Sequence, residues 1–217
     1  MKSKPTVKID YNDEKHEYNV FIDNVFVGRW DSVNQVLQAV GLLDFSKVPQ
    51  DKLLRAQKFG KAVHYATALD DVGRLDMSSV NPAILPHLES WRKFKKDYGL
   101  SFVESEIEQK MGSLIWRFCG TPDRYKIDGR TLLIPDLKSG SAIYDTTDLQ
   151  LGGYEALIPE WLNFTPKKVV RLIVQTTDEG IPKVHECKDI TDKTVFLSYL
   201  NTYRYELKHK IKREWRT

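Results

Sequence analysis

The chain is poor in sulfur: its 217 residues include only two cysteines, Cys119 and Cys187, and three methionines. Two cysteines set far apart can build neither a disulfide framework nor a four-cysteine zinc or iron–sulfur site, so no Fe–S cluster is expected. Apolar runs are short as well, and none approaches the roughly 20 residues that span a bilayer. Because the N-terminus also lacks the apolar core of a signal peptide, the sequence predicts a cytoplasmic protein with no membrane partner.

A strong excess of one charge is also missing. Lys and Arg number 33 against 30 Asp and Glu, which gives a formal net charge of +3, and 41% of the residues are hydrophobic. This balance is typical of a globular protein, and the length suits one domain with a full core. Basic residues nevertheless gather at 92–96, 167–171 and 208–216. Both DNA contact and ordinary solvated helix faces remain open interpretations of these clusters.

One stretch, residues 118–140, organises the rest of the chain. It contains two strand-like segments that flank Asp128-Gly129. An Asp-Gly pair between such segments predicts a tight β-hairpin with these two residues in the turn. In that register Lys126 lies opposite Thr131.

Asp123, Asp136 and Lys138 are expected to share one face of this hairpin, because side chains in strands alternate with a period of two. The two aspartates become diagonal neighbours, about 7–8 Å apart at the backbone. Two carboxylates directed at one point repel each other unless a cation lies between them, and oxygen ligands suit Mg²⁺ or Mn²⁺. Each acidic residue alone indicates little, since such residues are common at strand ends. Their combination predicts a divalent-metal site.

Apolar periodicity predicts the remaining elements. Helices are expected at 33–41, 51–70, 83–98, 150–158 and from 192 to the basic C-terminus. Strands outside the hairpin are expected at 6–11, 16–22, 25–29, 101–111, 167–176 and 181–188. Asp31 or Ser32 can cap the first helix. The order predicts an α/β (α+β) fold with a mixed central sheet flanked by helices on both faces and a small N-terminal β-meander.

The chain resembles the PD-(D/E)XK nuclease superfamily through Pro122-Asp123 and Asp136-x-Lys138, which match the two halves of its signature. The closer similarity is to the RecB-like, phage-type exonuclease branch. The resemblance implies a restriction-endonuclease-like core in a single domain over 1–217. Within it, 1–45 is interpreted as an accessory meander and helix, and 46–217 as the nuclease core.

The helix predicted at 51–70 carries a second family motif, Gly60-x-x-x-His64. Glycine inside a helix is less stable than alanine by about 0.5–1 kcal/mol, so a close approach to its backbone is expected. On the residues alone, a lone helical histidine is more often a core residue than a ligand. The resemblance implies that His64 coordinates metal.

Glutamates at 104, 106 and 108 fall on one face of the strand predicted at 101–111, which by itself indicates solvent exposure. The segment Ile107-Glu108-Gln109-Lys110 fits the family pattern best. The resemblance therefore implies Glu108 as the glutamate of the site, with Glu106 as the alternative. Gln150 and Tyr154 match a further Gln-x-x-x-Tyr motif that supports the lysine and the DNA backbone in that family.

The chemistry that the resemblance implies is hydrolysis of DNA phosphodiester bonds with two Mg²⁺ or Mn²⁺ ions. The implied metal ligands are His64, Asp123, Asp136 and the Leu137 carbonyl. The implied catalytic residues are Lys138, Asp136, Asp123, Glu108, Gln150 and Tyr154. Lys138 would polarise the attacking water or stabilise the developing charge, and Glu108 would hold a water or tune Lys138.

No separate sequence-reading module is apparent, so a nuclease of this kind is expected to act as a sequence-nonspecific exonuclease in DNA recombination, repair or processing in a bacterial or phage-infected cell. Endonuclease action stays open. So do a single-strand annealing or recombination protein as partner, and a homo-oligomer. Two other classes remain: an inactive nuclease fold that only binds DNA, and a structural protein whose acidic face is merely solvated.

Overall fold

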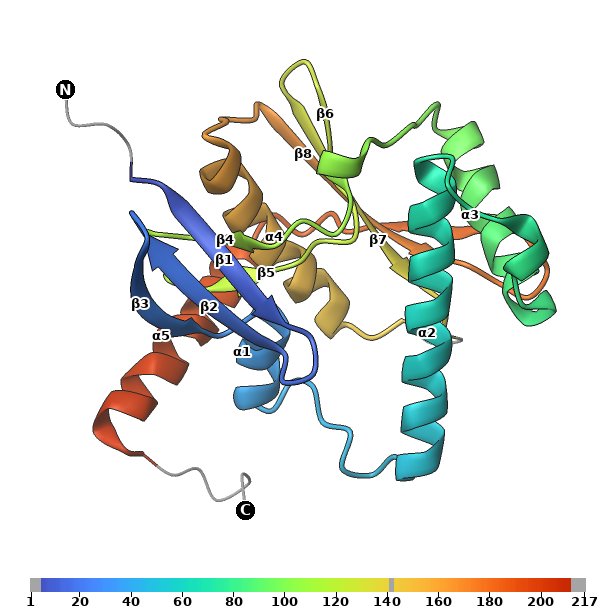
Figure 1. The fold of residues 1–217 in the computed structure, drawn as a ribbon. Helices are drawn as coiled ribbons and strands as arrows, with labels where there is room; N and C mark the ends of the chain where they lie inside the picture. The colour runs from blue at the N-terminus through green and yellow to red at the C-terminus, as the bar shows by residue number, and fades with distance from the viewer. Residues whose placement is uncertain (1–4, 141–142, 212–217) are drawn as a thin grey trace.

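The computed structural model describes residues 5–140 and 143–211 and shows a mixed α/β protein (Figure 1). The strands are β1 (Val7–Asn12), β2 (Glu17–Ile22), β3 (Val25–Trp30), β4 (Met111–Gly112), β5 (Cys119–Gly120), β6 (Lys126–Asp128), β7 (Thr131–Lys138), β8 (Lys168–Gln175) and β9 (Lys183–Glu186). The α-helices are α1 (Val33–Ala39), α2 (Gln50–Asp71), α3 (Leu85–Asp97), α4 (Thr146–Leu162) and α5 (Asp192–His209). Short 3₁₀ helices are η1 (Met77–Ser79), η2 (Pro82–Ile84) and η3 (Glu104–Glu106).

The N-terminal meander is confirmed: β1, β2 and β3 form an antiparallel sheet in that order. Helix α1 follows at once because Ser32 and Gln35 form a capping box, in which each side chain bonds the other residue's backbone amide. Ser32 rather than Asp31 is therefore the cap.

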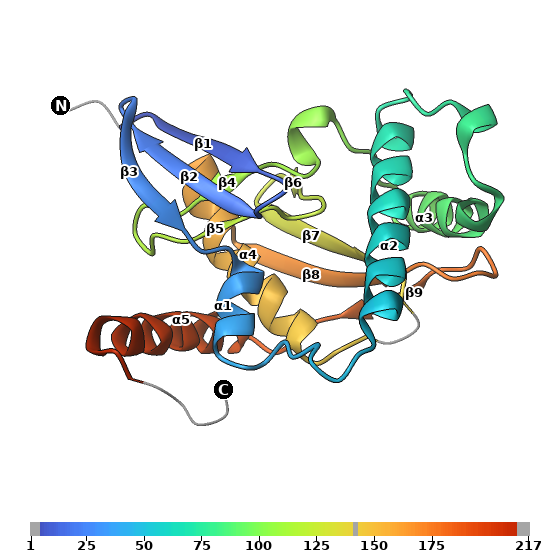
Figure 2. The same ribbon diagram turned by 60° about the horizontal axis from the view of Figure 1, so that its bottom comes forward.

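The predicted mixed sheet is also confirmed, in the order β6-β7-β8-β9. β6 and β9 are antiparallel to their neighbours, whereas β7 and β8 run parallel. A parallel pair needs a crossover connection, and α4 supplies it. Figure 2 shows α4 lying across β7 and β8.

The predicted hairpin register is wrong by two positions. Lys126 pairs with Leu133 and Asp128 with Thr131, which leaves Gly129 and Arg130 as the turn residues. Gly129 takes a φ of +55°, a conformation that suits glycine at the first position of a tight hairpin turn. A shift of two preserves the alternation of faces, so the predicted common face of the site residues is not altered by it.

Helices cover both faces of the central sheet, as the sequence predicted. On one face α1, α4 and α5 pack against alternate β7 residues, including Leu132 and Ile134. On the other face α2 and α3 pack against Leu137 and, from β8, against Leu172 and Val174. The end of β7 therefore lies between α2 and α4, and this position matters for the site.

Helices α2 and α3 are joined by partly buried ion pairs. Arg92 and Lys95 of α3 contact Asp70 at 2.6 and 3.2 Å, and Lys95 also contacts Asp71 at 2.7 Å. Two members of the basic cluster at 92–96 are thus paired with aspartates of α2. In the cluster at 167–171, Arg171 is buried and pairs with Glu155 and Asp192. Residues 212–216 of the third cluster lie outside the described residues.

Three predicted elements need correction. The predicted strand at 101–111 is wrong: only Met111 lies in a strand, β4, and Glu106 accepts a bond from the Val103 amide that closes the turn η3. Helix α4 starts at Thr146, earlier than predicted, and continues to Leu162. Helix α5 begins at Asp192 as predicted but ends at His209, where Lys210 turns into the left-handed region. No helix within 5–140 and 143–211 is long and apolar enough to cross a membrane.

Candidate metal centre

The end of strand β7 carries two site candidates on one face. Asp136 is almost fully buried, and its Oδ2 lies 2.6 Å from Lys138 Nζ. Both carboxylate oxygens nevertheless lack a hydrogen bond from the described residues, so the ammonium is an ion partner outside good hydrogen-bond geometry. A buried carboxylate without donors is unfavourable by itself. A metal cation at these oxygens would replace or share the ion pair with Lys138.

Asp123 lies just before β6 and reaches across to β7. Its Oδ2 accepts a 2.7 Å hydrogen bond from the backbone amide of Leu137, between Asp136 and Lys138. Its own carbonyl accepts from the Glu108 amide at 3.0 Å, and from the buried Arg124 guanidinium at 2.8 Å. The two aspartates predicted to converge are thus held together through the backbone of β7.

His64 of α2 approaches the same place from the other face of the sheet. Its Nε2 donates to the Leu137 carbonyl at 3.1 Å, while Nδ1 lies 3.3 Å from Asp123 Oδ1 and 3.9 Å from Glu108 Oε1. Since both ring nitrogens face acceptors, the doubly protonated ring fits best. Burial favours the neutral ring, but the negative charge of Asp123 outweighs it and raises the pKa of His64.

The two aspartates have opposite pKa shifts because their neighbours differ. Burial raises the pKa of Asp136 to about 6. Repulsion from Asp123 also raises this pKa, whereas the ammonium of Lys138 lowers it but does not outweigh the burial. Burial opposes ionisation of Asp123 too, but the positive charges of His64, Lys138 and Arg124 together lower its pKa to about 2. The His64 imidazolium is thus a cation beside Asp123.

A chain of hydrogen bonds holds Lys138 from the α4 side. Lys138 Nζ donates to Gln150 Oε1 at 3.1 Å, and Gln150 Nε2 donates to the Tyr154 hydroxyl at 3.3 Å. Tyr154 in turn donates to the Thr121 carbonyl at 3.1 Å, which returns the chain to the segment before Asp123. Gln150 and Tyr154 are one helical turn apart, so the early start of α4 brings both to the same side.

The three glutamates of the predicted strand separate. Glu104 pairs with Arg74 at 2.7 Å and Glu106 with Lys126 at 3.0 Å. Glu108 alone of the three turns toward the site. It does so through a φ of +45°, a backbone conformation that is uncommon outside glycine.

Gly60 stands one turn before His64 on α2. A Cβ added there would meet Ser139 Oγ at 3.5 Å, which is an ordinary contact. Contacts within the chain therefore give no steric reason for the glycine. The close approach expected from the sequence would have to come from a ligand.

A divalent ion fits this centre by its donor chemistry, because Asp136 supplies carboxylate oxygens that accept no hydrogen bond from the described residues and have the Lys138 ammonium as their ion partner. The side chains around Asp136 do not converge tightly on one point. Among the residues that the structure describes, only Asp148, His185 and Cys187 place three His, Cys, Asp or Glu ligand atoms within 4.8 Å of one another. Binding at Asp123 and Asp136 would accordingly require the side chains of His64 and Glu108 to move inward.

No protein-family model matches the chain, and no curated protein matches it in sequence. The geometry must therefore carry any functional conclusion by itself.

Sequence reasoning missed Arg124, whose side chain is fully buried. Its Nε contacts Asp71 Oδ2 at 2.7 Å, so it links the end of α2 to the segment that carries Asp123. A charged residue directly after an aspartate gave no signal that it would be buried. The cluster Asp148, His185 and Cys187 was missed as well, because its members are distant in sequence.

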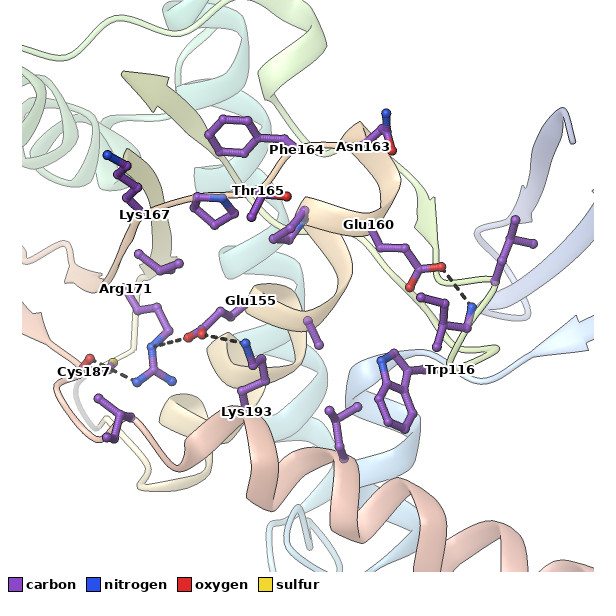
Figure 3. A pocket seen from close by; sticks show the side chains of 18 of the residues that line it. Trp116, Glu155, Glu160, Asn163, Phe164, Thr165, Lys167, Arg171, Cys187 and Lys193 are labelled. Carbon is purple, nitrogen blue, oxygen red and sulfur yellow. Dashed lines mark hydrogen bonds and ion pairs between the residues drawn. The ribbon is translucent and has the colours of Figure 1, made fainter. Parts of the chain in front are cut away.

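A large pocket lies away from this centre. It is an open cavity of about 1180 Å³ between α4, α5 and the segment after α4, lined in part by Trp116, Phe164 and Lys167 (Figure 3). None of the predicted site residues lines it. The centre at the end of β7 is a cluster of charged groups, which suits the binding of metal and phosphate better than an apolar ligand.

Proposed function

We propose that the protein is a Mg²⁺- or Mn²⁺-dependent deoxyribonuclease of the PD-(D/E)XK type, with RecB-like character, acting as a sequence-nonspecific exonuclease. One observation carries the proposal. Asp123, Asp136 and Lys138, which the sequence separates into two motif halves, meet around the Leu137 backbone, and the oxygens of Asp136 lack hydrogen bonds. A solvated acidic face, as in a structural protein, would not bury these groups.

In this proposal Asp123, Asp136 and the Leu137 carbonyl hold the principal metal ion, and His64 completes a second position. The metal ions would supply Lewis-acid stabilisation of the phosphate charge and lower the pKa of water. His64 would hold a metal through Nδ1, the nitrogen that faces Asp123 and Glu108, and this nitrogen would have to be deprotonated. Nε2 can keep its bond to the Leu137 carbonyl and so fix the orientation of the ring.

Lys138 is proposed to orient the attacking water and stabilise the charge that develops on the phosphate. Gln150 fixes the ammonium through its amide oxygen, and Tyr154 fixes Gln150 in turn. These two are positioning residues for the lysine. Glu108 lies within 3.9 Å of His64 Nδ1 and is proposed to hold a water near the second metal position.

DNA is proposed to approach along α2. The N-terminal half of this helix is exposed and carries Lys52, Arg55, Lys58 and Lys61 in the turns that lead up to His64. Phosphate contacts of this kind bind without reading sequence and weaken as salt rises. Figure 1 shows this half of α2 projecting beyond the central sheet. Within the described ranges we find no additional sequence-reading module, which favours a nonspecific enzyme.

A nonspecific nuclease needs some other restraint, and a requirement for a free DNA end would provide it. We therefore expect linear duplex DNA to be degraded while covalently closed circles are spared. The two substrates are compared at equal concentration, Mg²⁺ and salt, because salt alone shifts binding steeply. Asp136→Asn serves as the matched inactive control for a contaminating nuclease.

Three outcomes separate the alternatives. Loss of linear DNA alone supports an exonuclease. Cutting of closed circles at a similar rate indicates an endonuclease at the same centre. Salt-sensitive DNA binding without metal-dependent cleavage in either substrate would refute the enzyme proposal and indicate a DNA-binding protein with a nuclease-like site. Purification together with a single-strand annealing protein, or as a homo-oligomer, would address the expected partners.

A further inference from the structure

A second group of metal-binding residue types lies where the first turn of α4 meets the end of β9. Asp148 is in the first turn of α4, His185 is on β9, and Cys187 follows β9 directly. One ligand atom from each lies within 4.8 Å of those from the other two. His185 and Cys187 point the same way because they are two positions apart in an extended segment.

The donor set is the kind that zinc prefers. Thiolate, imidazole and carboxylate are its usual protein ligands, whereas Mg²⁺ and Ca²⁺ take oxygen and do not favour sulfur. With Zn–ligand bonds of about 2.0–2.3 Å, the ligand atoms of a tetrahedral site lie roughly 3.3–3.8 Å apart. Cys187 Sγ already lies 3.2 Å from Asp148 Oδ1, to which it donates. Closing the remaining separation requires only small side-chain movements.

The surroundings do not repel a cation. Arg171 is a buried positive charge that contacts this segment, through a 3.2 Å bond from its guanidinium to the Cys187 carbonyl. Its charge is balanced by Glu155 at 3.3 Å and Asp192 at 2.9 Å. Figure 3 shows Arg171 directed between Glu155 and Cys187 at one end of the large pocket.

Access and burial also suit a metal site. Cys187 is buried, Asp148 is half-buried and His185 is exposed, so the cluster opens to solvent on one side. Three protein ligands with an open side leave a fourth position for water, the usual arrangement of a three-ligand zinc site.

We propose that Asp148, His185 and Cys187 bind one Zn²⁺ ion with water as the fourth ligand. The ion would fasten the first turn of α4 to the end of β9. Since Asp148 is two residues before Gln150, the same turn carries the residue that holds Lys138. The site does not depend on the proposed nuclease activity, because none of its three ligands contacts DNA or the Asp136 centre in that proposal.

The test is a titration of the full chain, stripped with a chelator and kept reduced, with Co²⁺ and then Zn²⁺. Excess Mg²⁺ is present to occupy the carboxylates around Asp136. We expect a thiolate-to-cobalt charge-transfer band that saturates at one ion per chain and is displaced by Zn²⁺. Only a cysteine ligand gives that band. Because Cys119 is buried in the cluster beneath the N-terminal sheet, the band would report binding to Cys187.

Variants decide where the ion binds. His185→Ala changes an exposed side chain, so the fold should persist, and we expect at least an about 10-fold loss of zinc affinity, as even outer-sphere changes bring 10–100-fold losses. Cys187→Ser should abolish the charge-transfer band. His209 is another exposed histidine, and His209→Ala should leave the zinc affinity and the band unchanged. Zinc should raise the unfolding temperature of the parent and of His209→Ala but not of His185→Ala. Absence of the band in the parent, or zinc affinity unchanged in His185→Ala, would overturn the proposal.

Discussion

Asp123 and Leu137 are joined by a 2.7 Å hydrogen bond from the Leu137 amide to the Asp123 carboxylate. The first backbone pair between β6 and β7 is Lys126 with Leu133, so this bond joins the two chain segments outside the ladder. Asp123 therefore stabilises the fold in addition to any metal contact. Asp136 has no hydrogen bond to lose and is the cleaner probe of the site.

Asp136→Asn should remove DNA cleavage without harming the fold. We expect cleavage to fall by at least about 10²-fold, since one of the principal metal ligands is lost. In chelator, the free energy of unfolding should stay unchanged or rise by up to about 1–3 kcal/mol, the typical penalty of an unsatisfied buried group. In this variant Lys138 still donates to Gln150 and its side chain is 29% exposed, so its charge keeps a hydrogen-bond partner and contact with solvent.

Urea unfolding in chelator and cleavage of end-labelled linear DNA measure the two effects separately. A variant that still cleaves at nearly the parental rate would remove the basis for the whole site. A variant that unfolds would show instead that the Asp136–Lys138 pair is structural.

Lys138→Met should separate metal binding from catalysis. The ammonium lies 2.6 Å from Asp136 and competes with a divalent ion for that carboxylate, so metal affinity should be unchanged or higher. Turnover should drop by about 10²-fold or more, the scale of losing one donor to the transition state. Calorimetry with Mn²⁺ and single-turnover cleavage are the measurements. Weaker metal binding with a preserved rate would make the lysine a structural counter-charge.

His64→Ala should raise the Mn²⁺ concentration needed for activity. The ring contacts Asp123 and Glu108, so its loss removes one ligand from the proposed second position. Because mass action refills a weakened site, high Mn²⁺ should recover part of the rate. His209→Ala provides the control for a general effect of losing a histidine. The same Mn²⁺ dependence in parent and His64→Ala would leave His64 as a core residue.

Two helical glycines should respond in opposite ways to alanine. In Gly60→Ala the new Cβ meets only Ser139 Oγ, at 3.5 Å, so unfolding free energy should rise by about 0.5–1 kcal/mol from helix propensity. In Gly152→Ala it would lie 2.7 Å from the Asp192 backbone, where α5 begins, and stability should fall by about 1–3 kcal/mol or more.

Denaturant unfolding compares the two glycine variants directly. If Gly60 is kept for DNA, Gly60→Ala should also cleave more slowly despite its higher stability. An unchanged rate would mean that nothing approaches that backbone during cleavage.

The convergence of the site could be predicted because it depends on the parity of strand positions. The hairpin register was misplaced by two, since Asp128 takes the last pair and Arg130 enters the turn, yet the face shared by Asp136 and Lys138 was unaffected. The local sequence pattern alone could not predict the backbone conformation at the three glutamates or the contacts that they make. The period-two spacing of 104, 106 and 108 suggested a strand, but the bond from the Val103 amide to Glu106 favours a turn over extension.

Contacts between distant segments were beyond prediction. Arg124 follows a site residue and gave no sign that Asp71 would neutralise it inside the core. Asp148 and Cys187 carry no common motif, and they meet only because β8 and β9 lie beside α4. Such pairs depend on the packing of helices onto the sheet, which composition and periodicity do not specify.

The parallel pairing of β7 with β8 has a consequence for how the molecule folds. Asp136 pairs with Ile173 and Lys138 with Gln175, and the chain between them must first form α4 and cross the sheet. Contacts that close long loops form slowly compared with hairpins and single helices. We infer that the ladder bonds flanking the site, and with them the desolvation of its charges, appear late in folding. Pulse-labelled hydrogen exchange at the Thr176 amide, which donates to the Lys138 carbonyl at 2.8 Å at the end of this pairing, would report that step. The cluster thus becomes buried only after the rest of the chain has enough apolar contacts to offset its charge.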